Sequence, residues 1–110
     1  MRTLRDLEEK TCFNIRRLRY VIDHKIVPGK IPSSKSGFVG SARQLNNRQA
    51  VLTVAACHLL RAGIKRDTLR RLLIVKLQRQ WNTEDEVTVE ASPFVRITID
   101  LAAIREGIGL

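Results

Sequence analysis

Cysteine and histidine are scarce in this chain, and neither is arranged to bind a metal. Cys12 and Cys57 are its two cysteines, and His24 and His58 are its two histidines, 34 residues apart. Protein metal sites usually draw such residues from closely spaced pairs, and this chain has no pair of that kind. We therefore expect no metal and no other cofactor, and the isolated thiols favour a reduced, cytoplasmic setting.

Long apolar runs are also lacking. No segment approaches the ~18 consecutive apolar residues of a membrane-spanning helix. The N-terminal stretch MRTLRDLEEK has no apolar core of the kind found in a signal peptide. The sequence predicts a protein with no membrane partner.

Patterns that carry catalysis are missing too. The stretch PSSKSG resembles a phosphate-binding loop but lacks the G-x-x-x-x-G-K-[ST] pattern and a preceding strand. The acidic turn TEDEV contains no paired catalytic carboxylates, and no nucleophile stands beside a candidate base. We predict that the protein is not an enzyme and that it has no small-molecule effector.

Positive charge, in contrast, is abundant and unevenly distributed. The 110 residues, enough for one domain, carry a net charge of +9 with a pI near 10.6. Residues 1–80 hold 18 Lys and Arg against 5 Asp and Glu, whereas residues 81–110 hold 2 against 6. A solvated basic surface would not require this separation, so residues 1–80 are predicted to bind a nucleic acid.

Two short helices are predicted at the start of the basic part. Thr3 is a suitable N-cap for a helix through residue 10, and Asn14 for a helix over residues 14–24. The second helix has an apolar stripe at Ile15, Leu18 and Ile22. Arg16, Arg17 and Tyr20 point away from this stripe and Arg19 flanks it, and the spacing of the two helices is typical of a helix-turn-helix.

The following stretch, residues 26–46, is rich in Pro, Gly and Ser. It predicts a loop or short hairpin over residues 28–43 that carries Lys30, Lys35 and Arg43. Composition favours equally a flexible surface loop and a basic wing along a nucleic-acid backbone.

Two further helices and a hairpin complete the prediction. Asn46 is expected to cap a central helix that ends at Gly63, and a fourth helix follows over residues 65–81. The fourth helix directs Leu69, Leu72, Leu73 and Leu77 inward and Arg66, Arg70 and Arg71 outward. The alternating stretch VTVEASPFVRITID predicts a β-hairpin that turns at Ser92–Pro93, and a short helix capped by Asp100 should stop at Gly107. The fold class is therefore mainly α with small β elements.

The segment TCFNIRRLRYVIDHKIVP resembles the helix-turn-helix of MerR-type winged-helix regulators, whose pattern is approximately T-G-V-S-x-R-T-L-R-Y-Y-E-x-x-G-L-L-P. The resemblance extends over about residues 3–77, with the wing and a glycine turn after the third helix at the expected distances. It implies a winged helix-turn-helix of about four helices in residues 1–80. The residues that match outright are Thr11, Arg16, Leu18, Arg19, Tyr20 and Pro28, and those that are chemically similar are Phe13, Asn14, Ile26 and Val27.

The departures from the family pattern limit what carries over. Cys12 and Lys25 stand where the family usually has glycine. If Cys12 takes the left-handed backbone usual for this glycine, its side chain costs roughly 1 kcal/mol and Cys12→Gly would be neutral or stabilising; a destabilised variant would indicate another turn geometry or an inward-packed thiol. The long dimerisation helix and the metal- or drug-sensing domain of the full regulators are missing. The chain is thus similar to the stand-alone members, which include small regulators and excisionase-like factors.

The resemblance implies that the helix over residues 14–24 enters the major groove of double-stranded DNA. Arg16 and Arg17 are then expected to reach base edges, and Arg19 and Tyr20 phosphates, although Tyr20 also suits a half-buried packing role. The complete predicted DNA-binding set is Asn14, Arg16, Arg17, Arg19, Tyr20, Lys30, Lys35 and Arg43.

Three functions are compatible with this sequence. The favoured one is a sequence-specific, nucleoid-associated DNA-binding protein in transcriptional control. The others are a recombination directionality or DNA-bending factor with the same fold, and a protein-interaction module whose basic face binds an acidic partner.

Residues 81–110 are predicted either to mediate a homodimer or to fold back. In the first case an open strand edge pairs with a second copy. In the second case the hairpin packs on the fourth helix, with Trp81 and Phe94 filling the joint.

Overall fold

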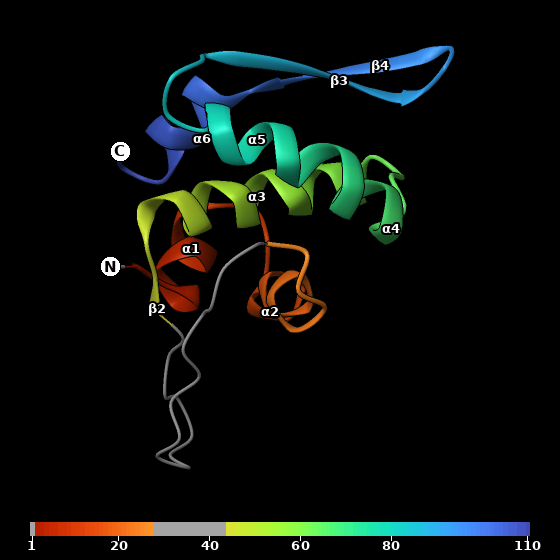
Figure 1. The fold of residues 1–110 in the computed structure, drawn as a ribbon. Helices are drawn as coiled ribbons and strands as arrows, with labels where there is room; N and C mark the ends of the chain where they lie inside the picture. The colour runs from red at the N-terminus through yellow and green to blue at the C-terminus, as the bar shows by residue number, and fades with distance from the viewer. Residues whose placement is uncertain (1, 28–43) are drawn as a thin grey trace.

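The computed structural model describes residues 2–27 and 44–110, except the side chains of 72–75. The fold is mainly helical with two small antiparallel sheets, as predicted (Figure 1). The predicted wing, residues 28–43, lies outside the described residues. The elements are β1 (Arg2–Thr3), α1 (Leu4–Lys10), α2 (Ile15–Asp23), β2 (Gln44–Leu45), α3 (Asn47–Arg61), α4 (Arg66–Thr68), the π-helical segment η1 (Leu69–Leu73), α5 (Ile74–Gln80), β3 (Glu86–Ser92), β4 (Val95–Asp100) and α6 (Leu101–Gly107).

The predicted helix starts are confirmed by their capping bonds. The Thr3 hydroxyl accepts from the Asp6 amide of α1, and the Asp6 carboxylate accepts from the Thr3 amide in return. Asn14 and Asn46 cap α2 and α3 through their side-chain oxygens, and Asp100 caps α6. These side chains satisfy N–H groups that the first helical turn leaves without a partner.

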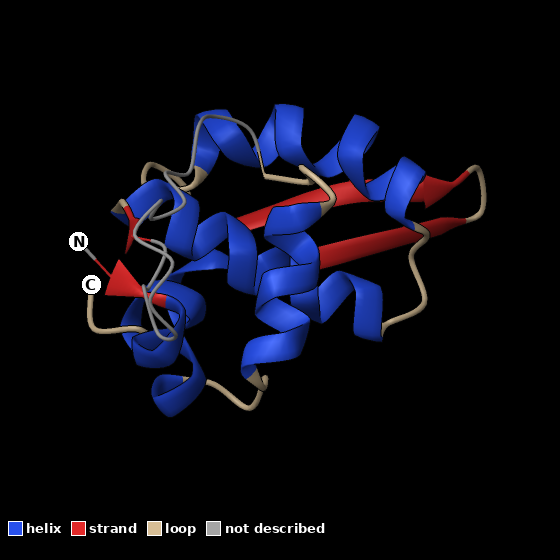
Figure 2. Cartoon of the chain, turned by 90° about the horizontal axis from the view of Figure 1, so that it is seen from below, coloured by secondary structure: helices blue, strands red, loops and turns tan. Residues whose placement is uncertain are grey.

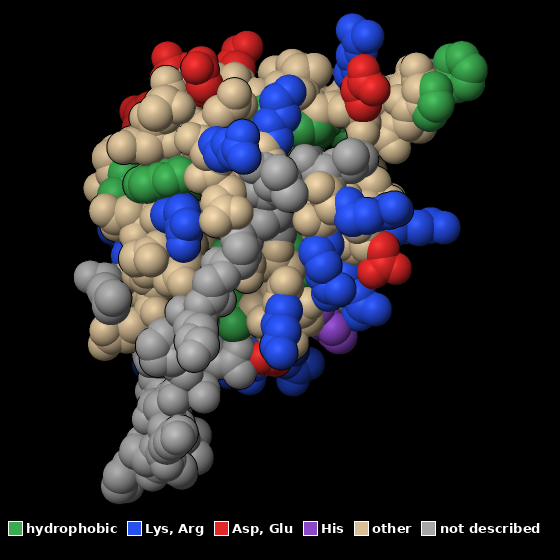
Figure 3. All heavy atoms as spheres, viewed as in Figure 1, with side chains coloured by type: hydrophobic (Ala, Val, Ile, Leu, Met, Phe, Trp, Pro, Cys, Tyr) green, Lys and Arg blue, Asp and Glu red, His purple; other side chains and the backbone are tan. Residues whose placement is uncertain are grey.

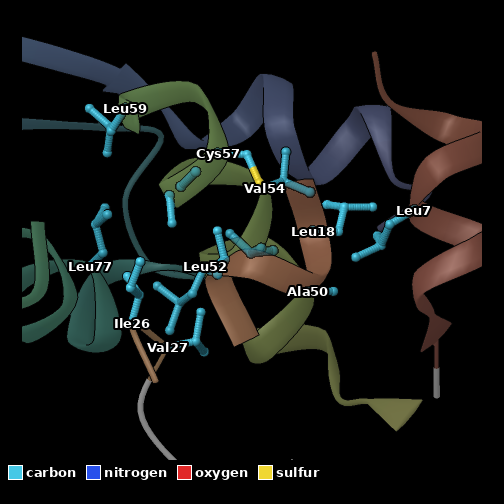
Figure 4. Packing of buried hydrophobic residues seen from close by; sticks show 14 of the residues in the cluster. Leu7, Leu18, Ile26, Val27, Ala50, Leu52, Val54, Cys57, Leu59 and Leu77 are labelled. Carbon is cyan, nitrogen blue, oxygen red and sulfur yellow. The ribbon is translucent and has the colours of Figure 1, made fainter. Parts of the chain in front are cut away.

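The helix α3 forms the centre of the molecule. Its residues from 49 to 57 are all buried, so it has core contacts on every side rather than along one stripe. Figure 4 shows the side chains of α1, α2 and α5 converging on this helix. The buried residues labelled there are Leu7, Leu18, Ile26, Val27, Ala50, Leu52, Val54, Cys57, Leu59 and Leu77.

The predicted fourth helix is present but is not a regular α-helix. A π-helical segment, η1, separates the single turn α4 from α5. Leu69 and Leu77 are buried and Arg70 and Arg71 are exposed, as predicted, whereas Arg66 is half-buried. The predicted inward side chains of Leu72 and Leu73 are among those that the structure does not describe.

The C-terminal hairpin is confirmed, with Pro93 and Phe94 at its turn. One face packs on the helices through Val87, Val89 and Ile99. Phe94 is 96% exposed, so the predicted joint with Trp81 is wrong: the hairpin tip carries Phe94 away from the body, while Trp81 packs against the core.

The hairpin and α2 lie on opposite sides of the molecule. Figure 1 shows the hairpin above α5, then α3, then α1 and α2, and Figure 2 shows the strands behind the helices when the molecule is viewed from below. The core continues across the predicted domain boundary at residue 80, because Val87, Leu101 and Ile108 belong to the same buried cluster as the helices. None of the helices in the described ranges has the length and hydropathy needed to cross a membrane.

Three helices end with the same backbone motif. After α2, the amide of Ile26 donates to Val21 O and the amide of Lys25 to Ile22 O, at 3.2 and 3.0 Å. This is the bond pattern of a Schellman motif, which needs a left-handed residue after the C-cap. The other two motifs, after α3 and α6, place Gly63 (φ +99°) and Gly109 (φ +85°) at that position.

Two expectations about individual residues are wrong. Among the described non-glycine residues Lys25 alone has a positive φ, 53°, so the left-handed backbone expected at Cys12 is found at Lys25 instead. The helix α6 includes Gly107 and is capped by Ile108, because Gly109 supplies the left-handed residue that closes it.

Candidate nucleic-acid interface

The outer face of α2 carries the predicted cationic side chains. Arg16, Arg17 and Arg19 are exposed, and Tyr20 is 41% exposed, so its packing role is at most partial. On the inner face Leu18 and Val21 are fully buried and Ile22 is nearly so. Ile15, predicted to lie in the apolar stripe, is only half-buried, and Val21 contributes more to the core.

The turn before α2 fixes the position of the arginines. The Thr11 hydroxyl donates to Leu7 O at 2.7 Å, which ties the turn to the end of α1. The Glu8 carboxylate accepts from the Ile15 amide at 2.5 Å, and Asn14 Oδ1 accepts from the Arg17 amide at 3.0 Å. The N-terminus of α2 is therefore capped from within the protein, and Asn14 acts as this cap.

The arginines of α2 form no ion pair within the described part of the chain. The first turn of α2 has no Asp or Glu, and among the described residues no carboxylate forms an ion pair with Arg16, Arg17 or Arg19. Cations near a helix N-terminus are disfavoured by the helix dipole, which the Glu8 carboxylate at Ile15 partly offsets. An anionic ligand on the outer face would add a counter-charge for the arginines themselves.

A shallow hollow of about 490 Å³ opens beside these arginines. Its lining combines the amide of Asn14, the guanidinium groups of Arg16 and Arg17, the Tyr20 ring and the apolar side chain of Leu60 from α3. Leu60 did not figure in the sequence prediction, since its place beside α2 depends on how the two helices cross. The hollow offers both hydrogen-bond donors and apolar surface to a ligand that lies along α2.

A second basic group extends this face beyond the end of α2. Arg66 Nη1 donates to His24 Nδ1 at 2.8 Å, and Arg70 Nη2 donates to the His24 carbonyl oxygen. The rings of Tyr20 and His24 lie 4.2 Å apart between their centroids. The arginine can only donate, so His24 Nδ1 is an acceptor and its ring proton is on Nε2.

The sequence prediction did not assign Arg66 and Arg70 to the site. The amphipathic pattern of residues 65–81 directed both arginines outward, but it did not indicate that they would lie beside α2. Figure 3 shows Lys and Arg side chains gathered over α2 and α4, whereas Asp and Glu side chains group where the hairpin begins. We call Arg16, Arg17, Arg19, Tyr20, Arg66 and Arg70 the α2 surface. The predicted Lys30, Lys35 and Arg43 lie outside the described residues.

The thiols and histidines of the described residues are not grouped as metal ligands. In the ranges covered by the structure, no three His, Cys, Asp or Glu residues are grouped to hold a metal. Burial raises the pKa of the Cys57 thiol to about 12, so this thiol is an unreactive core group. Cys12 is exposed, and its sulfur lies 3.1 Å from Arg61 Nη1.

The chain was compared with models of protein families, with curated proteins and with solved structures, and no match was found. The site is therefore interpreted from its own chemistry.

Proposed function

We propose that this chain is a sequence-specific double-stranded DNA-binding protein with a winged helix-turn-helix of the MerR type. In this proposal α2 lies in the major groove, α1 crosses the backbone and residues 28–43 form the wing. The protein acts on DNA as a regulator of transcription, without catalysis and without a cofactor. Its place in the cell is with the DNA of the nucleoid.

The observation that carries the proposal is the exposed arginine face of α2. Arg16 and Arg17 stand in the first turn of a helix whose position is fixed by the Glu8 and Asn14 bonds. Recognition helices contact bases mainly from their N-terminal residues. An arginine there donates two bonds to guanine O6 and N7, which discriminates by about 1–3 kcal/mol against the wrong base.

The remaining cations of the α2 surface suit phosphate oxygens. Arg19 and Tyr20 lie farther along α2, and Arg66 and Arg70 meet its C-terminal end at His24. Contacts to phosphates fix the orientation of the protein on the duplex and carry no sequence information. The proposal therefore assigns base reading to one end of α2 and backbone contacts to the other.

The test begins with selection of a preferred duplex from a random library, followed by fluorescence anisotropy on that duplex and on a scrambled one. Arg16→Ala and Arg17→Ala should lower the preference for the selected duplex. Arg79→Ala, an exposed arginine on α5, is the matched control and should leave the preference unchanged. Equal affinity for both duplexes, or tighter binding to single strands, contradicts the proposal.

Anisotropy also distinguishes DNA binding from binding to an acidic protein partner, if the same chain is titrated with duplex DNA and with an acidic polypeptide. A chain that binds duplex DNA only weakly at all salt concentrations, yet binds an acidic polypeptide, is a protein-interaction module. A chain that bends its selected duplex without affecting transcription from it is an architectural factor.

A further inference from the structure

The two edges of the C-terminal hairpin differ in what covers them. At the β3 edge, Lys76 Nζ of α5 donates to the Thr88 carbonyl oxygen at 2.6 Å. In the part of the chain that the structure covers, this sheet has two strands, so β4 has a neighbouring strand on one side only. Proteins often protect such edges with charged side chains, above all lysine, with proline or with a bulge. Here the register shift lies in β3, β4 (VRITID) contains neither lysine nor proline, and its two charged residues, Arg96 and Asp100, are opposite in sign.

The main-chain groups of β4 that face the open edge follow from the turn. Ser92 and Val95 flank the two-residue turn and form a hydrogen-bonded pair. Because N–H and C=O directions alternate along a strand, Arg96, Thr98 and Asp100 direct theirs away from β3. The Thr88 and Thr98 hydroxyls, 2.9 Å apart, agree with this assignment, since side chains are closest in pairs without main-chain bonds.

We propose that β4 pairs antiparallel with β4 of a second copy of this chain, with Thr98 opposite Thr98 on the two-fold axis. The outward N–H and C=O of Thr98 then bond to those of its copy, and the two hairpins form one four-stranded sheet. This register determines which residues of the two β4 strands lie opposite each other: the residue numbers of each facing pair sum to 196, as for Thr98 and its copy.

The charged rows are complementary in this register. Arg96 faces Asp100 of the second copy, and Asp100 faces its Arg96. Within one hairpin Asp100 is paired with Glu86, which sets two like charges opposite each other, while Arg96 forms an exposed ion pair with Glu90 at 3.7 Å. The described residues show no ion pair for Glu86 or Asp100 within the chain, so the second copy's Arg96 would supply a cation to this pair. Opposite charges across strands stabilise a sheet.

The apolar rows are complementary as well. Ile97 faces Ile99 of the second copy, which extends the apolar face that already packs on the helices. Val95, 49% exposed, lies opposite the start of the copy's α6, where Leu101 is itself fully buried, and Phe94, 96% exposed, approaches the same helix. Two of the large hydrophobic side chains that the single chain leaves exposed are thereby brought to the partner.

The two-fold axis of this pairing is perpendicular to the sheet, so both helical bodies lie on the same side of it. Because α2 lies on the far side of the helices from the hairpin (Figure 1), the two α2 helices belong to one face of the dimer. The biological reason for this dimer rests on the proposed function, because binding to two DNA half-sites requires two copies of the chain. The test of the dimer, however, uses no DNA.

The first experiment is sedimentation of the full chain and of two variants. Arg96→Glu makes its charged row entirely acidic, and Thr98→Pro removes the central donor without removing a bond to β3. Arg5→Glu, an exposed arginine on α1, changes the charge equally and is the control. We expect dimers for the full chain and for Arg5→Glu, and folded monomers, by circular dichroism, for Arg96→Glu and Thr98→Pro.

The second experiment tests the register. In a Cys12→Ser background, Thr98→Cys should be linked between chains by a short thiol-specific crosslinker. Thr88→Cys is the matched control, because it has the same side chain on the same face but lies at the outer end of the row. About three strand spacings of ~4.8 Å separate it from its copy, and it should not be linked.

The outcomes decide between the alternatives. A full chain that is monomeric at every concentration overturns the proposal, whatever other protein covers the edge. A dimer that persists in folded Arg96→Glu, or equal crosslinking of both cysteine variants, also overturns it. If Thr98→Pro does not fold, Arg96→Glu and the crosslink still decide. A dimer that shows no preference for any DNA would contradict the proposed function alone, and a monomer that binds DNA would contradict this interface alone.

Discussion

The conformation of Lys25 predicts that a glycine at this position stabilises the protein. Lys25 is exposed and has φ 53°, the left-handed region, whereas the equivalent Schellman position is Gly63 after α3 and Gly109 after α6. A side chain in this region costs about 1–2 kcal/mol. Glycine also gives the unfolded chain more freedom, which offsets about 0.5–1 kcal/mol of that gain. Lys25→Gly should therefore raise the free energy of unfolding by about 0.5–1 kcal/mol.

The assay is equilibrium unfolding in urea, with the midpoint rising and the slope unchanged. Two variants serve as controls. Gly63→Ala should lose about 0.5–1 kcal/mol, because no atom lies within 4 Å of the added Cβ and the cost is the left-handed backbone less the freedom that alanine removes from the unfolded chain. Cys12→Gly should also be destabilising, since Cys12 has no positive φ and its sulfur contacts Arg61. A less stable Lys25→Gly, or a more stable Cys12→Gly, would refute this account of the two turns.

Three further predictions concern the α2 surface, the core and the effect of pH. Arg70→Ala should weaken selected and scrambled duplexes alike and reduce the slope of log K against log salt by about 0.9, measured by anisotropy; an unchanged slope would remove Arg70 from the phosphate contacts. Leu18→Ala, at a fully buried position between α2 and α3, should cost about 2–5 kcal/mol in urea unfolding, and a cost under ~1 kcal/mol would mean that this interface is loose. Partial burial of the otherwise exposed His58, together with Arg61, lowers its pKa. Its contribution to stability is therefore present above the pKa of an unfolded-chain histidine, ~6.5, and is lost as pH falls toward the lower native value. His58→Gln should flatten that part of the stability–pH curve, and an unchanged curve would show that His58 is not its source.

Features that depend on a few neighbouring residues were predictable from the sequence. Thr3, Asn14, Asn46 and Asp100 are confirmed as caps, because a cap is formed by one side chain and an amide three residues later. The hairpin is confirmed for a similar reason, since alternation and a turn at Pro93 act within fourteen residues, although the turn residues are Pro93–Phe94 rather than Ser92–Pro93. The exposed positions of Arg16 and Arg17 follow from helical phase once α2 is correctly placed.

Features that depend on contacts between distant segments were not predictable. His24 and Arg66 are 42 positions apart, and only the packing of the fourth helix against the end of α2 brings them within 2.8 Å. The choice between Cys12 and Lys25 as the left-handed residue depended on which helix end needed a Schellman closure, and the family pattern had glycine at both. The wing over residues 28–43 and its lysines stay a prediction.

The sequence alone determined where the helices and the hairpin begin, and which part of the chain is basic, because capping, periodicity and charge are local properties. Only the tertiary structure decided which cations join the α2 surface, that Phe94 is carried away from the core, and that β3 rather than β4 is covered by Lys76. Side chains far apart in the chain come into contact only in one of the many arrangements that the local preferences allow. The close packing of the buried residues around α3 determines that arrangement, and these residues come from the whole chain rather than from one short stretch.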